Sequence, residues 1–358
     1  MEPPKLKLSW KSIVFPLLGI VGFFIYIYLF RVNILGILST VYKVNPLIYG
    51  AAVGVGLAEV LFFSVSWRVL TSYLSIKLSV TRAYLYVWYG IYVDTIVPAQ
   101  SISGEVTRTY LCTRDKCGPF GKVVASLYTH RLLGMLINIV SLVLGVVLLT
   151  FGGNVNPLIF NAIIVVTAAI VAIMVLMMVL SFKRQWTTKI VGWATKFAGK
   201  VTRGRWKLSS VETQALEITE HFHDSMKEFG HSPKALAGSM VYLVIAWVCN
   251  LSIPYLVFRS LDHPVSWSVI LVTSAIFLAV KSIPLGVPEV GLPEAVMTTL
   301  YISMGVPGAL AATATILTRI ITLWLRFFIG FGAQQWLELK PLGSGAAEME
   351  KPKIAPVA

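Results

Sequence analysis

The sequence predicts an all-α polytopic integral membrane protein in which two inverted repeats supply six transmembrane helices and two re-entrant helical hairpins. Three observations support this fold class. The chain of 358 residues is 56% hydrophobic and only 13% charged. Its apolar residues form long runs, as in membrane proteins rather than in soluble domains. Two of these runs stop at a proline before they are long enough to cross a bilayer.

The net charge of +14 is distributed as in a membrane protein rather than as in a nucleic-acid-binding protein. Lys and Arg cluster between the apolar runs, as membrane topology requires. With the N-terminus inside, the inside segments hold 23 Lys and Arg, and the outside segments hold three, Arg31, Lys43 and Arg259. This bias predicts a multi-pass protein of the cell membrane with cytosolic N- and C-termini and no nucleic-acid partner.

Six apolar segments reach the length of a transmembrane helix, which is about 20 residues for a ~30 Å hydrocarbon core. The first has Lys5, Lys7 and Lys11 before it and no convincing small-residue cleavage site, so we interpret it as an uncleaved span. The six predicted spans are Ser12–Phe30, Pro46–Trp67, Lys122–Thr150, Pro157–Phe182, Ala235–Phe258 and Ala309–Gly332.

The two remaining apolar regions are predicted to be re-entrant hairpins. Ala83–Val97 ends directly before Pro98, and Trp267–Ile283 ends directly before Pro284. Proline interrupts a helix because it lacks an amide donor. A short second helix follows each break and would extend only ~15–18 Å, about half of the hydrocarbon core. Ser103 is the predicted N-cap of the first of these second arms. The two second arms are Gly104–Thr113 and Pro293–Met304.

The chain is predicted to form one membrane domain, residues 1–335, followed by a flexible cytosolic tail, residues 336–358. A basic cytosolic loop, residues 183–234, contains an amphipathic helix suited to the surface of an anionic membrane. We interpret this loop as a topology-setting segment rather than as a dedicated regulatory site.

The histidines and cysteines predict neither a metal site nor a disulfide framework. His221, His223 and His231 are interpreted as solvated, because no Cys or carboxylate set stands near them at ligand spacing. Cys112 and Cys117 fall in a segment placed on the cytosolic side, where thiols stay reduced. We therefore expect no metal and no cofactor.

A repeat is visible in the spacing of the charged residues. Each half contains an apolar arm, a proline break, a glutamate at the start of a short helix, a Gly/Pro turn and a span with an arginine. Glu105 and Arg131 are 26 residues apart, and Glu294 and Arg319 are 25 residues apart. Three full spans separate the hairpins, an odd number, so the second half is predicted to be inverted relative to the first. Such repeats are typical of transporters whose broken helices meet near the midplane. The predicted repeats are residues 12–150 and 157–332.

These four charged residues lie in apolar sequence, where a charge costs ~2.5–3.5 kcal/mol at a helix centre and is by default functional. Arg131 and Arg319 are predicted to bind an anionic lipid headgroup together with the amides at the two helix N-termini, because a guanidinium donates two hydrogen bonds to a phosphate. Glu105 and Glu294 would pair with the arginines while the site is empty. The alternative is that both Glu–Arg pairs are purely structural.

Five further residues are second-tier candidates for substrate binding. Asp94 and Lys281 lie near the deep ends of the first arms, and Glu289 has no counterpart in the first half. Glu59, in the second span, would pair with Lys281 or Asp94 if its role were structural. Arg108 follows Glu105 by three residues in the second arm.

Several of these residues resemble the motifs of a known family. In the first half they are Pro98, Gly104, Glu105, Arg108 and the run from His130 to Gly134. In the second half they are Pro284, Gly286, Glu289, Gly291, Glu294 and the run from Leu317 to Arg319. About residues 12–335 resemble the lysylphosphatidylglycerol synthase transmembrane (flippase-like) family, which implies translocation of modified phospholipids or glycolipids across the bilayer.

The tip of the second motif departs from the family pattern. The family usually has a Gly-Gly-Leu-Gly-type tip before the glutamate, whereas this chain reads G-V-P-E-V-G-L-P-E. Either Glu289 or Glu294 can therefore be the family acid, and the substrate can differ from that of other members.

The expected function is that of a lipid translocase, which moves an anionic phospholipid or a lipid-linked sugar between leaflets, and not that of an enzyme. The sequence contains no H-E-x-x-H, no G-x-S-x-G and no Gly-rich phosphate loop. Two alternatives stay open, a membrane-embedded enzyme that acts on lipid phosphate through the hairpin carboxylates, and a non-catalytic partner of a glycosyltransferase. No synthase or glycosyltransferase domain follows the membrane domain, so we expect any lipid-modifying enzyme to be a separate partner. Whether the protein forms an oligomer is also left open.

Overall fold

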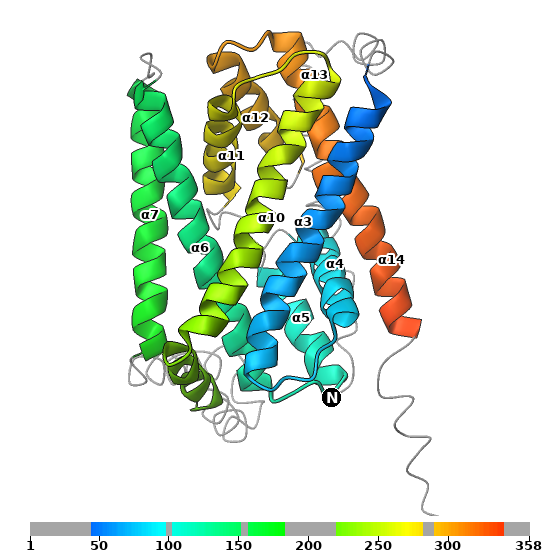
Figure 1. Ribbon diagram of the computed structural model, residues 1–358, viewed down its shortest axis with the longest axis vertical. Coiled ribbons are helices and arrows are strands. Elements are labelled where there is room, and N and C mark those ends of the chain that lie inside the picture. The colour runs from blue at the N-terminus through cyan, green and yellow to red at the C-terminus, as the bar shows by residue number, and fades with distance from the viewer. Residues whose placement is uncertain (1–43, 98–101, 152–156, 183–219, 282–289, 340–358) are drawn as a thin grey trace, which may run out of the picture.

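The computed structural model describes five stretches of the chain, and all regular secondary structure within them is helical (Figure 1). The all-α class is therefore confirmed. The described stretches are residues 44–97, 102–151, 157–182, 220–281 and 290–339.

The helices follow the predicted segments. They are α3 (Pro46–Tyr73), α4 (Val80–Ile96), α5 (Ile102–Arg114), α6 (Phe120–Phe151), α7 (Pro157–Phe182), α10 (Pro233–Ser260), α11 (Trp267–Lys281), α12 (Leu292–Ser303), α13 (Gly308–Arg319), the π-helix η1 (Ile320–Leu325) and α14 (Arg326–Leu339). A short helix also covers residues 220–230.

Within the described residues, four stretches of helix are long and apolar enough to cross a membrane, as expected for a multi-pass protein. The predicted first span, Ser12–Phe30, lies outside the described residues, and the predicted span Pro157–Phe182 is not among the four, so the count of six stays a prediction. The four stretches are Pro46–Tyr73, Phe120–Gly145, Pro233–Ser260 and Gly308–Leu339.

The first arms of both predicted hairpins end close to the prolines, α4 at Ile96 and α11 at Lys281, while Pro98 and Pro284 lie outside the described residues. Val97, at the end of α4, is extended with ψ of 104°, as expected for a residue that precedes a proline. In Figure 1 the pair α4 and α5 lies in the lower half of the molecule, and the pair α11 and α12 lies in the upper half. The two hairpins thus reach the middle of the bundle from opposite ends, as an inverted repeat requires.

The prediction that Ser103 caps α5 is wrong. The helix begins at Ile102, so Ser103 already lies in its first turn. Its hydroxyl donates to Oδ1 of Asp94 at 2.5 Å and lies 3.1 Å from the carbonyl oxygen of Val97. The amide of Gly104 donates to the same Asp94 oxygen at 2.7 Å. The first arm of the hairpin therefore caps the second arm.

The long helices α3 and α10 pack side by side through the centre of the bundle (Figure 1). Their contact uses small side chains, which let two helices approach closely in an apolar environment. Ser66 Oγ lies 2.8 Å from Oγ of Ser239 and donates to the Ser239 carbonyl oxygen at 2.9 Å. This pair forms the frame to which both hairpins attach.

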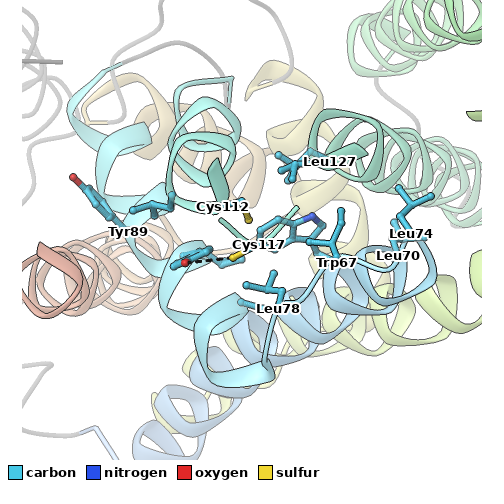
Figure 2. Packing of buried hydrophobic residues seen from close by; sticks show 14 of the residues in the cluster. Trp67, Leu70, Leu74, Leu78, Tyr89, Cys112, Cys117 and Leu127 are labelled. Atoms are coloured by element: carbon cyan, nitrogen blue, oxygen red, sulfur yellow. Dashed lines mark hydrogen bonds between the residues drawn. The ribbon is translucent and has the colours of Figure 1, made fainter. Parts of the chain in front are cut away.

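A cluster of buried residues joins the lower hairpin to this frame. Figure 2 shows Trp67 and Leu127 beside Cys112 and Cys117 in the cluster. Trp67 is fully buried, and its indole Nε1 donates to the hydroxyl of Ser126 at 3.1 Å. The cluster holds α5 in a fixed position against α3 and α6.

The described basic residues gather at the lower end of the bundle. Lys77 and Arg82 flank the turn between α3 and α4, and Lys116 and Lys122 flank the turn between α5 and α6. At the upper helix ends, Arg259 is the one Lys or Arg within the described ranges. This distribution agrees with a cytosolic lower end.

The prediction that the loop histidines are solvated is wrong for His223. Residues 220–230 form a helix that packs on the lower core, and His223 is 3% exposed beside Phe222. The Phe229 ring of this helix stacks on Tyr73 with centroids 5.7 Å apart. His231 is exposed, as predicted. Apolar residues at the end of the basic loop therefore pack on the bundle, whereas residues 183–219 lie outside the described part.

Candidate functional site

A cavity of about 340 Å³ that is lined by apolar and charged residues lies in the middle of the bundle. Both hairpins contribute to its wall, together with α3, α6, α10 and the helical stretch from α13 to α14. Charged residues are expensive at this depth unless they have a partner or a ligand. The ionisable residues that line the cavity are Glu59, Asp94, Arg108, Arg319 and Arg326.

The second hairpin holds a fully buried ion pair. Glu294 Oε1 accepts a hydrogen bond from Nε of Arg319 at 2.6 Å, and the two side chains are 2% and 5% exposed. The other Glu294 oxygen accepts the amide of Gly291 at 2.6 Å. Gly291 has φ of +96°, a conformation that favours glycine. Glu294 thus both caps α12 and connects it to α13.

The first hairpin divides the same two tasks between two carboxylates. Asp94 caps α5 from α4, and Glu105 accepts a hydrogen bond from Nη1 of Arg131 at 2.8 Å. The Arg131 and Glu105 side chains are 25% and 22% exposed. The two Glu–Arg pairs expected from the sequence spacing are therefore both present, one buried and one partly open.

The prediction that free amides at the helix N-termini bind the headgroup does not hold for the amides of Gly104 and Gly291. These amides already donate to Asp94 and Glu294. A carboxylate is the natural partner for a helix N-terminus, where the helix dipole is positive. In this conformation the side chains, rather than these amides, form the polar surface of the cavity.

Glu59 has a partner that differs from either expected one. Its Oε2 accepts a hydrogen bond from Nη2 of Arg326 at 2.7 Å, which links α3 to α14. We expected Lys281 or Asp94 in this place. Lys281 ends α11, and its side chain lies outside the described part of the structure.

Arg108 differs from the other arginines of the cavity. It is 6% exposed, and its guanidinium carbon lies 5.3 Å from the ring centroid of Trp67 and 5.8 Å from that of Phe63. Its Nε donates to the Gly104 carbonyl oxygen at 3.4 Å, and its Nη1 has no hydrogen-bond partner. Among the described residues no carboxylate forms an ion pair with it.

Two backbone irregularities adjoin the cavity. Pro254 lies inside α10 and also lines the cavity, and its missing amide removes the usual donor to the carbonyl of Asn250, another lining residue. The π-helix η1 separates Arg319 from Arg326, and π-helical turns are frequent at functional sites. Both features coincide with the charged part of the wall.

A profile of the family described as "Lysylphosphatidylglycerol synthase TM region" matches residues 13–330. The chain belongs to this family. The match includes every helix around the cavity up to the middle of α14.

Three curated relatives of this chain are archaeal membrane proteins of similar length. A UPF0104 membrane protein of Pyrococcus horikoshii is 22% identical over 276 residues, which are 76% of this chain and 82% of the relative. One from Methanothermobacter thermautotrophicus is 21% identical over 291 residues, 81% and 86% of the two chains. A third, from Methanocaldococcus jannaschii, is 23% identical over 273 residues, 75% and 78% of the two chains. These names identify membrane proteins and give no activity.

Within this family member the structure places the sequence-predicted residues in three groups. Asp94, Glu59, Arg108 and Arg319 line the cavity, and Glu294 contacts it through Arg319. A second group, Glu105 and Arg131, forms its ion pair without lining the cavity. Glu289 lies outside the described residues.

Sequence reasoning missed Arg326, which is the partner of Glu59 and a lining residue. The signal was available, because Arg326 lies seven residues after Arg319 in the same predicted span, and an ionisable residue within a span is by default a functional candidate. Asn250 and Thr318, also in the wall, gave no comparable signal.

Proposed function

We propose that this protein is a lipid translocase that moves an anionic phospholipid or a lipid-linked sugar between the two leaflets of the cell membrane. The central observation in support is that two helical hairpins from opposite ends of an apolar bundle line one cavity that contains five ionisable residues. The cavity volume of about 340 Å³ suits a headgroup rather than a whole lipid. The acyl or prenyl chains would stay in the bilayer.

The proposed mechanism uses the Glu–Arg pairs as exchangeable contacts. A guanidinium pairs with a carboxylate and with a phosphate through the same donors, so Arg131 and Arg319 can exchange a glutamate for the headgroup. The partly open Arg131–Glu105 pair would meet the headgroup first, and the buried Arg319–Glu294 pair would open later. Alternating opening of the two halves then moves the headgroup across the midplane.

The test is the translocation of fluorescent phosphatidylglycerol in vesicles that contain the pure full-length protein. We expect the wild-type protein to transfer the labelled lipid between leaflets and Arg131→Ala or Arg319→Ala to slow the transfer at least tenfold. Arg259→Ala, at the upper helix end, serves as the matched control and should transfer at the wild-type rate. If Arg131→Ala and Arg319→Ala both keep the wild-type rate, the exchange mechanism is wrong.

The same vesicles discriminate between transport and chemistry. Mass spectrometry of the extracted lipid detects loss of phosphate or a change in the headgroup, and either result would support a membrane-embedded enzyme instead. We expect the lipid to be recovered unchanged.

A further inference from the structure

Three buried hydrogen-bond donors, on three of the residues that line the cavity, have no acceptor among the described residues. They are Nη1 of Arg108, the hydroxyl of Thr318 and Nε of Arg326, and all three atoms are buried. Buried polar groups in folded proteins nearly always have a partner, and an unsatisfied one costs about 1–3 kcal/mol. Three donors without an acceptor in one cavity indicate a ligand that is rich in acceptors.

The fixed surroundings of Arg108 indicate that it is placed for binding. Its guanidinium lies over Trp67, a fully buried residue, and over Phe63, and its Nε bond to Gly104 leaves Nη1 available. A cation over an aromatic ring is stabilised by ~0.5–2 kcal/mol, which is less than an ion pair can give to a buried arginine. The Nη1 donor would gain most from an anion in the cavity.

The other two donors come from the second half of the chain. Thr318 lies in α13 and Arg326 begins α14, whereas Arg108 lies in the first hairpin. Arg326 uses Nη2 to bind Glu59, and its Nε stays without a partner. An acceptor group between the two halves could therefore be held by both.

We propose that Arg108, Thr318 and Arg326 bind the phosphate of the transported headgroup, and that this phosphate is a diester with one negative charge. The proposal rests on the proposed function and adds to it a central phosphate site, separate from the exchangeable contacts at Arg131 and Arg319, and a substrate class. A phosphodiester offers several acceptor oxygens to the three donors. Glu59 and Asp94 line the same cavity, so each further negative charge, as in a phosphomonoester or a diphosphate, would meet repulsion from a carboxylate.

Titration of the purified full-length protein with soluble phosphate compounds tests the site without a transport assay. The probes are dihexanoyl phosphatidylglycerol, dihexanoyl phosphatidic acid, farnesyl diphosphate and inorganic phosphate. Tryptophan fluorescence is the readout, because Trp67 lies beside Arg108 and Trp247 lines the cavity. We expect the diester to bind at least tenfold more tightly than each of the other three.

Variants at two of the three donors, Thr318 and Arg108, assign the site. Thr318→Val removes the hydroxyl and keeps the shape of the side chain, and we expect it to weaken diester binding about three- to tenfold. Its matched control is Thr313→Val in the same helix, a buried threonine whose hydroxyl already donates to the Ala309 carbonyl oxygen at 2.8 Å. This control should bind like the wild type. Arg108→Gln should reduce affinity more than tenfold.

If Arg108→Gln does not fold, Arg108→Lys replaces it, because it keeps a positive charge over the rings. This variant should still bind the diester at least fivefold more weakly, because the guanidinium fork is gone. Wild-type affinity in Thr318→Val and Arg108→Lys would overturn the site. If the diphosphate or phosphatidic acid binds more tightly than the diester, the assignment of the substrate as a phosphodiester is wrong. If inorganic phosphate binds as tightly as the diester, the site is assigned to free phosphate. Lipid transfer by the wild type with unchanged rates in these variants would refute the site while the proposed function stands. Diester binding at the site without any transfer would refute the function instead.

Discussion

Individual charged residues in this bundle differ most in how completely their charge is enclosed. Glu294 and Arg319 are almost fully buried, whereas Glu105 and Arg131 keep about a quarter of their side-chain surface exposed. Breaking a buried pair leaves an unsatisfied charge and typically costs 3–5 kcal/mol, but an exposed pair contributes only ~0–1 kcal/mol. Two pairs that look equivalent in the sequence therefore have different consequences for stability.

The first prediction uses this difference. Glu294→Gln should lower the apparent melting temperature of the detergent-solubilised protein clearly more than Glu105→Gln does. The double variant Glu294→Gln and Arg319→Gln should recover part of the loss, because no charge is then left buried without its partner. Equal shifts for the two single variants would show that the difference in burial does not govern stability.

At the same scale, the sequence predicted the two Glu–Arg pairs because their spacing recurs in both halves. It did not predict the Glu59–Arg326 pair, which joins residues 267 positions apart on α3 and α14. Nor could it predict that Asp94 caps α5 while Glu105 pairs with an arginine, whereas Glu294 performs both tasks alone in the second hairpin. Such choices depend on distances between helices, which a single sequence does not supply.

At the scale of the elements, proline placement predicted the hairpins and the ends of their arms. The last span was expected to be one regular helix, and the structure instead contains α13, the π-helix η1 and α14. Ile321 of η1 packs directly on Gly56 of α3, where an added Cβ would lie 2.8 Å from its Cγ2 atom. A local change of helical pitch that fits such a contact has no signature in the apolar pattern.

The packing of α14 against α4 yields a second prediction. A Cβ at Gly330 would lie 2.5 Å from the Trp88 carbonyl oxygen and 2.8 Å from Cβ of Tyr92, whereas Gly332 has no neighbour within 4 Å. Gly330→Ala should therefore separate the two helices and destabilise the protein by about 1–3 kcal/mol. Gly332→Ala should be neutral or slightly stabilising, because alanine favours a helix. Denaturant titrations of both variants measure their free energies of unfolding. Equal values for Gly330→Ala and Gly332→Ala would refute the tight contact between α14 and α4.

At the scale of the whole molecule, the charge distribution predicted a lower, cytosolic end that agrees with the described basic residues. The hairpins lie in opposite halves of the bundle (Figure 1). The inversion of the two repeats also requires the path of residues 1–43, which lie outside the described part. Membrane topology therefore tests the inversion directly.

The third prediction concerns this topology. Ser72 and Ser303 are exposed at the lower end of α3 and the upper end of α12. In intact cells, a membrane-impermeant maleimide should label Ser303→Cys and should reach Ser72→Cys only after permeabilisation. The parent chain supplies the background; in it Cys249, which is partly exposed, is replaced by Ser, whereas Cys112 and Cys117 are buried. Labelling of both positions from the same side would contradict the inverted arrangement.

Translocation itself is tested most directly by the dithionite accessibility of labelled phosphatidylglycerol in vesicles with the pure protein. Without transfer, dithionite bleaches only the label in the outer leaflet. We predict that vesicles with the wild-type protein lose the label of both leaflets, and that the Arg319→Ala protein at equal density loses the inner share at least tenfold more slowly. An inner-leaflet label that stays protected in wild-type vesicles, as in protein-free ones, would contradict the translocase function.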